Sequence, residues 1–267
     1  MKTGCGIVTL LTDFGPGMYC AAMKAVILNV APYVRIVDVC HTVSPQNITE
    51  AAFVLRSVAG NFSPGTVHCV VVDPGVGTSR RIILAEGGDY FFLAPDNGVL
   101  TLSLETFGAG RAWSVENDAF FRKPVSRTFH GRDIFAPVAA ELAAGARPEA
   151  FGPEIDAEAM VKHLLPEPVV GRNEIEGHLV FIDGFGNLVS NISEKELSAM
   201  GPHDELAVEF QGHRLAGINA TYGDARRGEA LALIGSLGLL EIAVARGSAA
   251  ARFPAAEGDR IVVRRAP

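Results

Sequence analysis

The first half of the chain alternates short apolar runs with stretches whose apolar residues recur every three or four positions. The apolar runs predict strands at 7–11, 35–39, 66–72, 82–84 and 90–94. The recurring positions predict helices at 18–29, 47–58 and 133–143. In the first helix, Ala22, Val26 and Val30 fall on one face, which we expect to be buried. Strands that alternate with helices predict a mostly parallel sheet covered on both faces.

The pattern changes near residue 152, beyond which helical periodicity is scarce. Short apolar runs separated by turn residues follow at 175–182, 188–192, 206–210, 229–234, 239–243 and 260–263. Runs at intervals of roughly ten residues are typical of a small β-barrel or sandwich. We therefore predict a Rossmann-like α/β domain at 1–160, a linker at 161–171 and a small β-barrel domain at 172–267.

Composition narrows the class of protein. The 267 residues are 48% hydrophobic, which is enough for a substantial core, and the net charge of −7 disfavours a nucleic-acid partner. No apolar stretch approaches the roughly 20 residues of a membrane span, and no signal peptide is visible. None of the four cysteines forms a C-x-x-C pair, so we expect reduced thiols and no metal site. Together these features predict a cytoplasmic protein that binds neither nucleic acid nor membrane.

Three predicted strands run directly into a segment that carries a carboxylate, at Asp13, Asp73 and Asp96. Ligands of open α/β sheets bind beyond the carboxyl ends of the strands, so the three carboxylates predict one polar rim. The alternative is a set of ordinary turns, because Asp-Gly and Pro-Gly are common turn pairs. The glycine-rich turn at 73–78 lacks the Gly-Lys-Ser/Thr of a phosphate-binding loop, which disfavours phosphate binding.

A histidine lies in the segment Thr128-Phe129-His130-Gly131-Arg132-Asp133. The Asp133 side chain is well placed to cap the helix predicted at 133–143. His130 is therefore either a loop histidine beside a capped helix or part of a reactive site, and this segment leaves both possibilities open.

The second half carries three turns with candidate chemistry: Asp183-Gly184-Phe185-Gly186-Asn187, Asn219-Ala220-Thr221-Tyr222-Gly223-Asp224 and Ile234-Gly235-Ser236-Leu237-Gly238. Each is also explained as a plain glycine turn. Tyr222 either stacks on a base or covers the end of the barrel, and the third turn offers backbone N–H groups to a carboxylate.

These motifs together resemble the S-adenosylmethionine hydroxide adenosyltransferases, relatives of the fluorinating and chlorinating adenosyltransferases. Six motifs occur in the family's order: Leu11-Thr12-Asp13-Phe14-Gly15, Asp73-Pro74-Gly75-Val76-Gly77-Thr78, Ala94-Pro95-Asp96-Asn97-Gly98, Phe129-His130-Gly131-Arg132-Asp133, Asp183-Gly184-Phe185-Gly186-Asn187 and Ser190-Asn191-Ile192. The resemblance covers about residues 7–265. It implies a larger α/β domain, a small C-terminal β-barrel, and a homotrimer with each substrate between the first domain of one subunit and the barrel of the next.

The resemblance also implies a hydrolase in which water displaces L-methionine at C5′ of S-adenosyl-L-methionine and leaves adenosine. Asp73, Arg80 and His130 match the family's water-handling set. The halogenating relatives carry an aromatic at the Asp73 position and lack the histidine, so this set favours water over halide. S-adenosyl-L-methionine is then the substrate, and no cofactor is expected.

By the same resemblance, five residues bind the parts of the substrate. Asp13 would accept the ribose hydroxyls, Asn187 would read the adenine edge and Tyr222 would stack on the adenine. Asp183 would pair with the methionine ammonium, and Ser236 would bind its carboxylate.

Phe129 is also assigned to the substrate-binding residues. Two positions depart from the family's pattern. Met18 stands where an Asp is usual, and Leu239 stands where an aromatic is common. Neither departure touches the water-handling set.

Two other functions remain open at this point. One is halogenation that uses S-adenosyl-L-methionine, and the other is a non-catalytic sensor of S-adenosyl-L-methionine or adenosine. A sensor has no need of a water-orienting set, so Asp73, Arg80 and His130 favour an enzyme.

Overall fold

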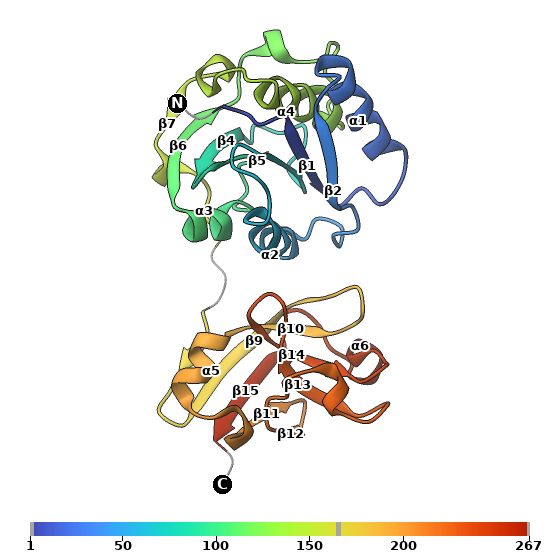
Figure 1. The fold of residues 1–267 in the computed structure, drawn as a ribbon, viewed down its shortest axis with the longest axis vertical. Coiled ribbons are helices and arrows are strands. Elements are labelled where there is room, and N and C mark those ends of the chain that lie inside the picture. Colours follow the sequence, from blue (N-terminus) through green and yellow to red (C-terminus); the bar gives the residue numbers. More distant parts are fainter. Residues whose placement is uncertain (1–2, 164–166, 266–267) are drawn as a thin grey trace. The chain divides into compact units, whose positions relative to one another are not determined.

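The computed structural model describes residues 3–163 and 167–265 and divides the chain into two compact units (Figure 1). Unit 1 comprises residues 1–164 and unit 2 comprises residues 165–267. The boundary falls within the linker predicted at 161–171, of which residues 164–166 lie outside the described residues. Residues 1–2 and 266–267, at the ends of the two predicted domains, also lie outside them.

Unit 1 is built on a seven-stranded sheet with the order β2-β1-β3-β5-β4-β6-β7. Its strands are β1 (Ile7–Thr12), β2 (Arg35–Cys40), β3 (Val67–Val71), β4 (Ile82–Gly87), β5 (Tyr90–Pro95), β6 (Ala109–Ser114) and β7 (Glu154–Ile155). The neighbours β2, β1, β3 and β5 are parallel, whereas β4, β6 and β7 pair antiparallel. All five strands predicted in this half are present, but the predicted mostly parallel sheet is a mixed one. Only Gly88 and Asp89 connect β4 to β5, and so short a connection permits antiparallel pairing alone.

Helices cover both faces of this sheet, as predicted. They are α1 (Met18–Val30), α2 (Ile48–Ala59), α3 (Thr101–Phe107) and α4 (Ala136–Ala143). α1 and α4 pack together over one face, and α2 and α3 pack together over the other (Figure 1). The start of α2 is capped by Asn47, whose side chain accepts a hydrogen bond from the Glu50 N–H at 2.9 Å. The sequence pattern missed α3, which has only seven residues.

The buried face of α1 differs from the predicted one. Cys20, Met23 and Ile27 are buried, whereas Val30 is exposed. This helix is apolar on nearly every side, so its periodicity does not select a single face. The contact with α4 selects the face instead.

Unit 2 contains a nearly closed, barrel-like sheet with the order β12-β11-β15-β9-β10-β14-β13, to which β8 adds by pairing with β9 (Figure 1). The strands are β8 (Val169–Val170), β9 (Glu174–Ile182), β10 (Leu188–Ser193), β11 (Leu206–Phe210), β12 (His213–Ala216), β13 (Ala230–Ile234), β14 (Leu239–Val244) and β15 (Arg260–Arg265). All six strands predicted here are present, around their own apolar core. Two helices were not predicted, α5 (Glu194–Met200) and α6 (Ala249–Arg252). The Ser193–Glu196 capping box that begins α5 is a readable sequence signal.

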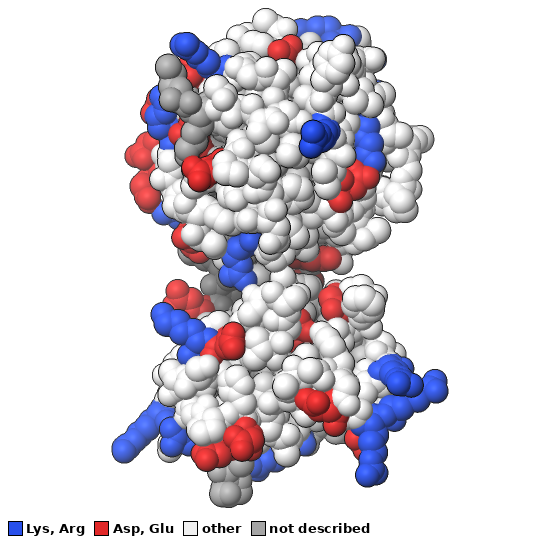
Figure 2. Space-filling model, in the orientation of Figure 1, with Lys and Arg blue, Asp and Glu red and all other residues white. Residues whose placement is uncertain are grey.

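Charged side chains are spread over the surfaces of both units. On the face drawn in Figure 2, much of unit 1 is uncharged, and more basic side chains project from unit 2. In unit 2, Arg260 pairs with Glu176 at 2.6 Å and Arg264 with Glu174 at 3.0 Å. Within the described ranges, no helix is both long and apolar enough to span a bilayer.

Candidate active site

The three strand-end carboxylates lie at the same edge of the sheet in unit 1. Asp13, Asp73 and Asp96 follow β1, β3 and β5, which are parallel neighbours, so the predicted rim is present. Both carboxylate oxygens of Asp96, however, already bind other groups of the protein. One oxygen accepts the Val161 N–H at 2.8 Å, and the other pairs with Arg81 at 2.6 Å. Asp96 therefore fastens the segment before the unit boundary to the rim, a structural role that Asp13 and Asp73 do not share.

Asp73, Arg80 and His130 meet at this rim from two different loops. Arg80 Nε donates to both oxygens of Asp73 at 3.0 Å, and its Nη2 also bonds Asp73 Oδ2. The same Nη2 lies 2.9 Å from His130 Nδ1. The side chains of Asp73 and Arg80 are largely buried, which strengthens their attraction. The fold thus brings His130 to Asp73 and Arg80, although His130 follows Arg80 by 50 residues in the sequence.

The contact with Arg80 settles the role of one His130 nitrogen. A guanidinium has only donors, so Nδ1 must accept, and the neutral ring carries its proton on Nε2. Burial lowers the pKa of His130, and the Arg80 charge lowers it further, against weaker opposition from Asp73 and Asp133. His130 is therefore a neutral histidine that presents an Nε2–H donor.

Asp133 does not cap the following helix, contrary to the sequence expectation. His130 stands at the start of a π-helical turn, Gly131–Phe135, which continues into α4. The fully buried Asp133 carboxylate instead accepts from Arg132 Nε at 2.7 Å, the Ser126 N–H at 2.8 Å and Arg122 at 3.1 Å. Burial alone raises the pKa of Asp133, but these hydrogen bonds outweigh it and hold the pKa below its usual range. Asp133 thus fixes the loop that presents His130.

Phe129 lies in an aromatic cluster with Tyr19 and with Phe14, the residue that follows Asp13. The Phe129 ring lies 5.9 Å from that of Phe14 and 5.2 Å from that of Tyr19, between ring centroids. The Asp13 carboxylate accepts the Gln46 N–H at 2.8 Å and remains partly exposed. Tyr19, in the first turn of α1, was not predicted as part of this site, and its ring lies 6.0 Å from that of Phe14. Met18, which departs from the family's pattern, is exposed.

In unit 2, Asp183 and Asn187 form one tight turn between β9 and β10. Asp183 Oδ1 accepts the Phe185 and Asn187 backbone N–H groups at 2.8 and 2.9 Å. Its Oδ2 accepts from Asn187 Nδ2 at 2.9 Å. The turn interpretation of this motif is therefore correct, and the same bonds hold the side chains of Asp183 and Asn187 in one fixed orientation.

A carboxylate that sequence reasoning missed lies among the predicted unit 2 residues. The buried Glu241 accepts a hydrogen bond from the Tyr222 hydroxyl at 2.9 Å. Burial, with help from Glu241 and Asp183, raises the pKa of Tyr222 to about 12, so the hydroxyl stays protonated and donates. Ser236 lies exposed in the turn between β13 and β14. Glu241 sits in the apolar run predicted at 239–243, and a single acid inside such a run is the signal that points to it.

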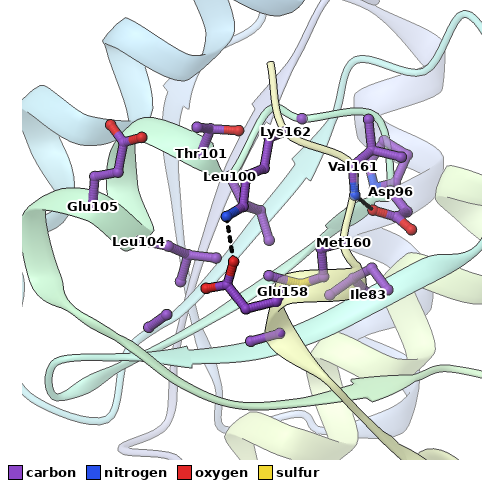
Figure 3. Close-up of a pocket in the computed structure, with 14 residues that line it drawn as sticks. Ile83, Asp96, Leu100, Thr101, Leu104, Glu105, Glu158, Met160, Val161 and Lys162 are labelled. Atoms are coloured by element: carbon purple, nitrogen blue, oxygen red, sulfur yellow. Dashed lines mark hydrogen bonds and ion pairs between the residues drawn. The ribbon is translucent and has the colours of Figure 1, made fainter. Parts of the chain in front are cut away.

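A separate cavity of about 190 Å³ lies in unit 1 beside α3 (Figure 3). Leu100, Leu104 and Met160 contribute to its largely apolar lining, and Lys162 pairs with Glu158 at 2.6 Å. Of the rim carboxylates, only Asp96 borders it. The residues with candidate chemistry thus lie elsewhere. Over residues 3–163 and 167–265, no group of three or more His, Cys, Asp or Glu side chains is arranged to hold a metal ion.

Comparison with known families gives matches to both halves of the chain. Residues 8–152 match the SAM hydroxide adenosyltransferase N-terminal domain, and residues 177–262 match the C-terminal domain of the same family.

Individual relatives match over nearly the whole chain. An (R)-S-adenosyl-L-methionine hydrolase of Salinispora tropica is 38% identical over 264 residues, which are 96% of this chain and 97% of the relative. One of Thermus thermophilus is 36% identical over 259 residues, 94% of this chain and 96% of the relative. A fluorinase of Nocardia brasiliensis is 29% identical over 280 residues, covering 93% of this chain and 92% of the relative. The crystal structure of an uncharacterized conserved protein from Thermotoga maritima is similar with a TM-score of 0.89 and 38% identity, covering 97% of this chain and 100% of that one.

Proposed function

The chain belongs to the SAM hydroxide adenosyltransferase family, and from this premise we propose that it hydrolyses S-adenosyl-L-methionine to adenosine and L-methionine. The observation that carries the proposal is the cluster of Asp73, Arg80 and His130 at the carboxyl edge of the sheet. The hydrolases of Salinispora tropica and Thermus thermophilus, which share more than a third of their residues with this chain, support it.

The reaction balances as a single displacement at C5′. The oxygen of water bonds to C5′, the C5′–S bond breaks, and its electron pair stays on sulfur, which becomes the neutral thioether of L-methionine. The attacking oxygen loses a proton and becomes the 5′-hydroxyl of adenosine. A sulfonium leaves without being protonated, so the protein has to hold water in line with the C5′–S bond and need not supply an acid.

The three residues of the cluster take different tasks in this proposal. Arg80 places a permanent positive charge near the water and favours its hydroxide character. His130 donates from Nε2–H and orients the water, because its Nδ1 is already engaged by Arg80. Asp73 has only acceptor atoms, which makes it the member suited to take the proton.

The remaining candidate residues bind the substrate. In unit 1, Asp13 accepts the ribose hydroxyls and Phe129 contributes aromatic surface. In unit 2, Asn187 hydrogen-bonds the edge of the adenine, and the Tyr222 ring stacks on the face of the adenine. Asp183 and Ser236 take the ammonium and the carboxylate of the methionine part.

The division of these residues between two units supports a shared site. We propose a homotrimer in which unit 1 of one subunit and unit 2 of the next enclose each substrate, acting in the cytoplasm. Mixing inactive His130→Ala protein with inactive Asn187→Ala protein, under conditions that exchange subunits, tests the sharing. Partial recovery of activity is expected. Demonstrated mixed oligomers without activity would mean that each site is built within one chain.

Product analysis tests the reaction itself. Purified protein incubated with S-adenosyl-L-methionine should release adenosine and L-methionine in equal amounts, at the same rate with and without chloride or fluoride. A 5′-halogenated nucleoside as the main product would identify a halogenase. Tight binding of S-adenosyl-L-methionine without turnover would identify a sensor, and either result would overturn the proposal.

A further inference from the structure

Glu241 occupies a place in the barrel where a carboxylate is costly. It lies on β14, whose six residues are all buried, and it pairs in register with Val189 of β10 and Leu233 of β13. Only 4% of Glu241 is exposed. Burying a carboxylate costs free energy unless its environment compensates, so an acid at this position calls for an explanation that packing does not supply.

The residues around Glu241 are among the proposed substrate-binding residues of unit 2. Its Oε2 accepts from the Tyr222 hydroxyl at 2.9 Å. Burial raises the pKa of Glu241, and the nearby charge of Asp183 raises it further, against the opposing effect of the Tyr222 bond. On the other side, a Cβ placed on Gly235 would lie 1.7 Å from Glu241 Oε1, so the glycine before Ser236 leaves the room that the carboxylate fills.

Tyr222 has the exposure expected of a stacking platform. It is 46% exposed while its hydroxyl is anchored on Glu241, so the bond restrains a ring that would otherwise rotate in solvent. The ring stands in a short 3₁₀ turn, Tyr222–Asp224, whose Thr221–Asp224 capping box fixes the backbone. Backbone and hydroxyl are therefore both held, and a ring fixed before binding loses little entropy when a base stacks on it.

We propose that Glu241 is a positioning residue that holds the Tyr222 ring in the orientation that stacks on the adenine of the substrate. The assignment rests on the proposed function, because that function makes Tyr222 the adenine platform. Glu241 acts through Tyr222 and contacts neither the attacking water nor C5′.

Binding of adenosine, measured by calorimetry, tests this assignment without requiring turnover. Glu241→Met keeps the side chain's volume but removes the acceptor, whereas Glu241→Gln keeps an acceptor. Tyr222→Phe removes the hydroxyl from the other side and changes a residue of an exposed turn, not of the barrel strands. The matched control is Glu209→Gln, a barrel glutamate that pairs with Arg264.

We expect Glu241→Met and Tyr222→Phe each to weaken adenosine binding roughly tenfold, the effect of losing one hydrogen bond to a charged group. The double variant should be no weaker than either single one, and Glu241→Gln should recover most of the loss. With S-adenosyl-L-methionine, KM should rise while kcat stays near the wild-type value.

Three results would overturn the assignment: wild-type affinity in Glu241→Met, losses that multiply in the double variant, or a Glu241→Gln variant as weak as Glu241→Met. Each of these presupposes wild-type protein that binds adenosine. Wild-type protein that binds no adenosine would contradict the proposed function itself, and this assignment with it.

Discussion

The Asp73–Arg80–His130 cluster of unit 1 and the proposed binding residues of unit 2 differ in how their charges are balanced. In unit 1, Asp73 has the cation of Arg80 within 3.0 Å, and Arg80 in turn bonds a neutral His130. In unit 2, Asp183 and Glu241 receive hydrogen bonds from backbone N–H groups, an amide and a hydroxyl. The first group is balanced within the protein, and the second carries negative charge that these neutral donors leave uncompensated.

This difference in charge balance suits the two groups to different tasks, the reaction in unit 1 and substrate binding in unit 2. A balanced cluster keeps its geometry whether or not a ligand is present, which suits groups that must orient water. An anionic cluster gains most from a cation, and S-adenosyl-L-methionine carries both a sulfonium and an ammonium. We therefore expect changes in the Asp73–Arg80–His130 cluster of unit 1 to lower turnover and changes in the anionic residues of unit 2 to lower affinity.

The largest expected effect is a loss of turnover when a residue of the Asp73–Arg80–His130 cluster is replaced. A loss of affinity in its place would contradict the division between the two units. Asp73→Ala and His130→Ala should each lower kcat by about 10²–10⁴-fold, the usual contribution of a positioned proton-transfer or orienting group. Affinity for S-adenosyl-L-methionine should stay within a few-fold of wild type. Single-turnover kinetics and calorimetry measure the two quantities separately.

The control for these variants is His213→Ala, which changes an exposed histidine of β12 and should leave both quantities unchanged. A large loss of affinity at unchanged kcat would move Asp73 and His130 to a binding role.

Asp13 sharpens the comparison, because it lies at the same rim as Asp73 but is assigned to binding. Asp13→Ala should weaken adenosine binding by about 2–4 kcal/mol through the loss of two charge-assisted hydrogen bonds to the ribose. The 2′,3′-dideoxy analogue of adenosine should bind the variant and the wild type about equally. Wild-type protein that binds adenosine and the analogue equally well would refute the diol assignment.

The smallest expected effect is on the free energy of unfolding at acid pH. His68 is fully buried on β3, the strand that delivers Asp73, and its ring stacks on Phe92 with centroids 5.2 Å apart. Burial lowers the pKa of His68 to about 4. Between the ordinary pKa of 6.5 and about 4, the unfolded chain binds more protons than the folded one, so acid favours unfolding.

The free energy of unfolding should therefore fall by about 2 kcal/mol between pH 7 and pH 5 on account of His68. His68→Phe should flatten this part of the pH dependence, and His213→Phe should not. Urea titrations at both pH values give the two free energies. An unchanged slope in His68→Phe would show that another group controls acid stability.

The sequence pattern predicted the strands that carry the site better than the sheet they form. The parallel neighbours β1, β3 and β5 placed Asp13 and Asp73 on one edge, as expected, but Asp96 proved to be bound by Arg81 and Val161. A carboxylate after a strand looks the same in sequence whether it meets a ligand or a distant arginine.

Both misses arise because the partner of the carboxylate, and not the local sequence pattern, decides where its side chain lies. Asp133 resembles a helix cap locally, yet Arg122 and Arg132 draw it into the interior. Glu241 was passed over as part of an apolar strand, although its partner Tyr222 had been singled out.

The central claim is that water attacks C5′ in a site that contains the Asp73–Arg80–His130 cluster. Incubation with S-adenosyl-L-methionine in ¹⁸O-labelled water, followed by mass spectrometry of the products, tests it most directly. We predict one ¹⁸O atom in the 5′-hydroxyl of adenosine and none in L-methionine. Label in L-methionine, or free adenine among the products, would contradict it.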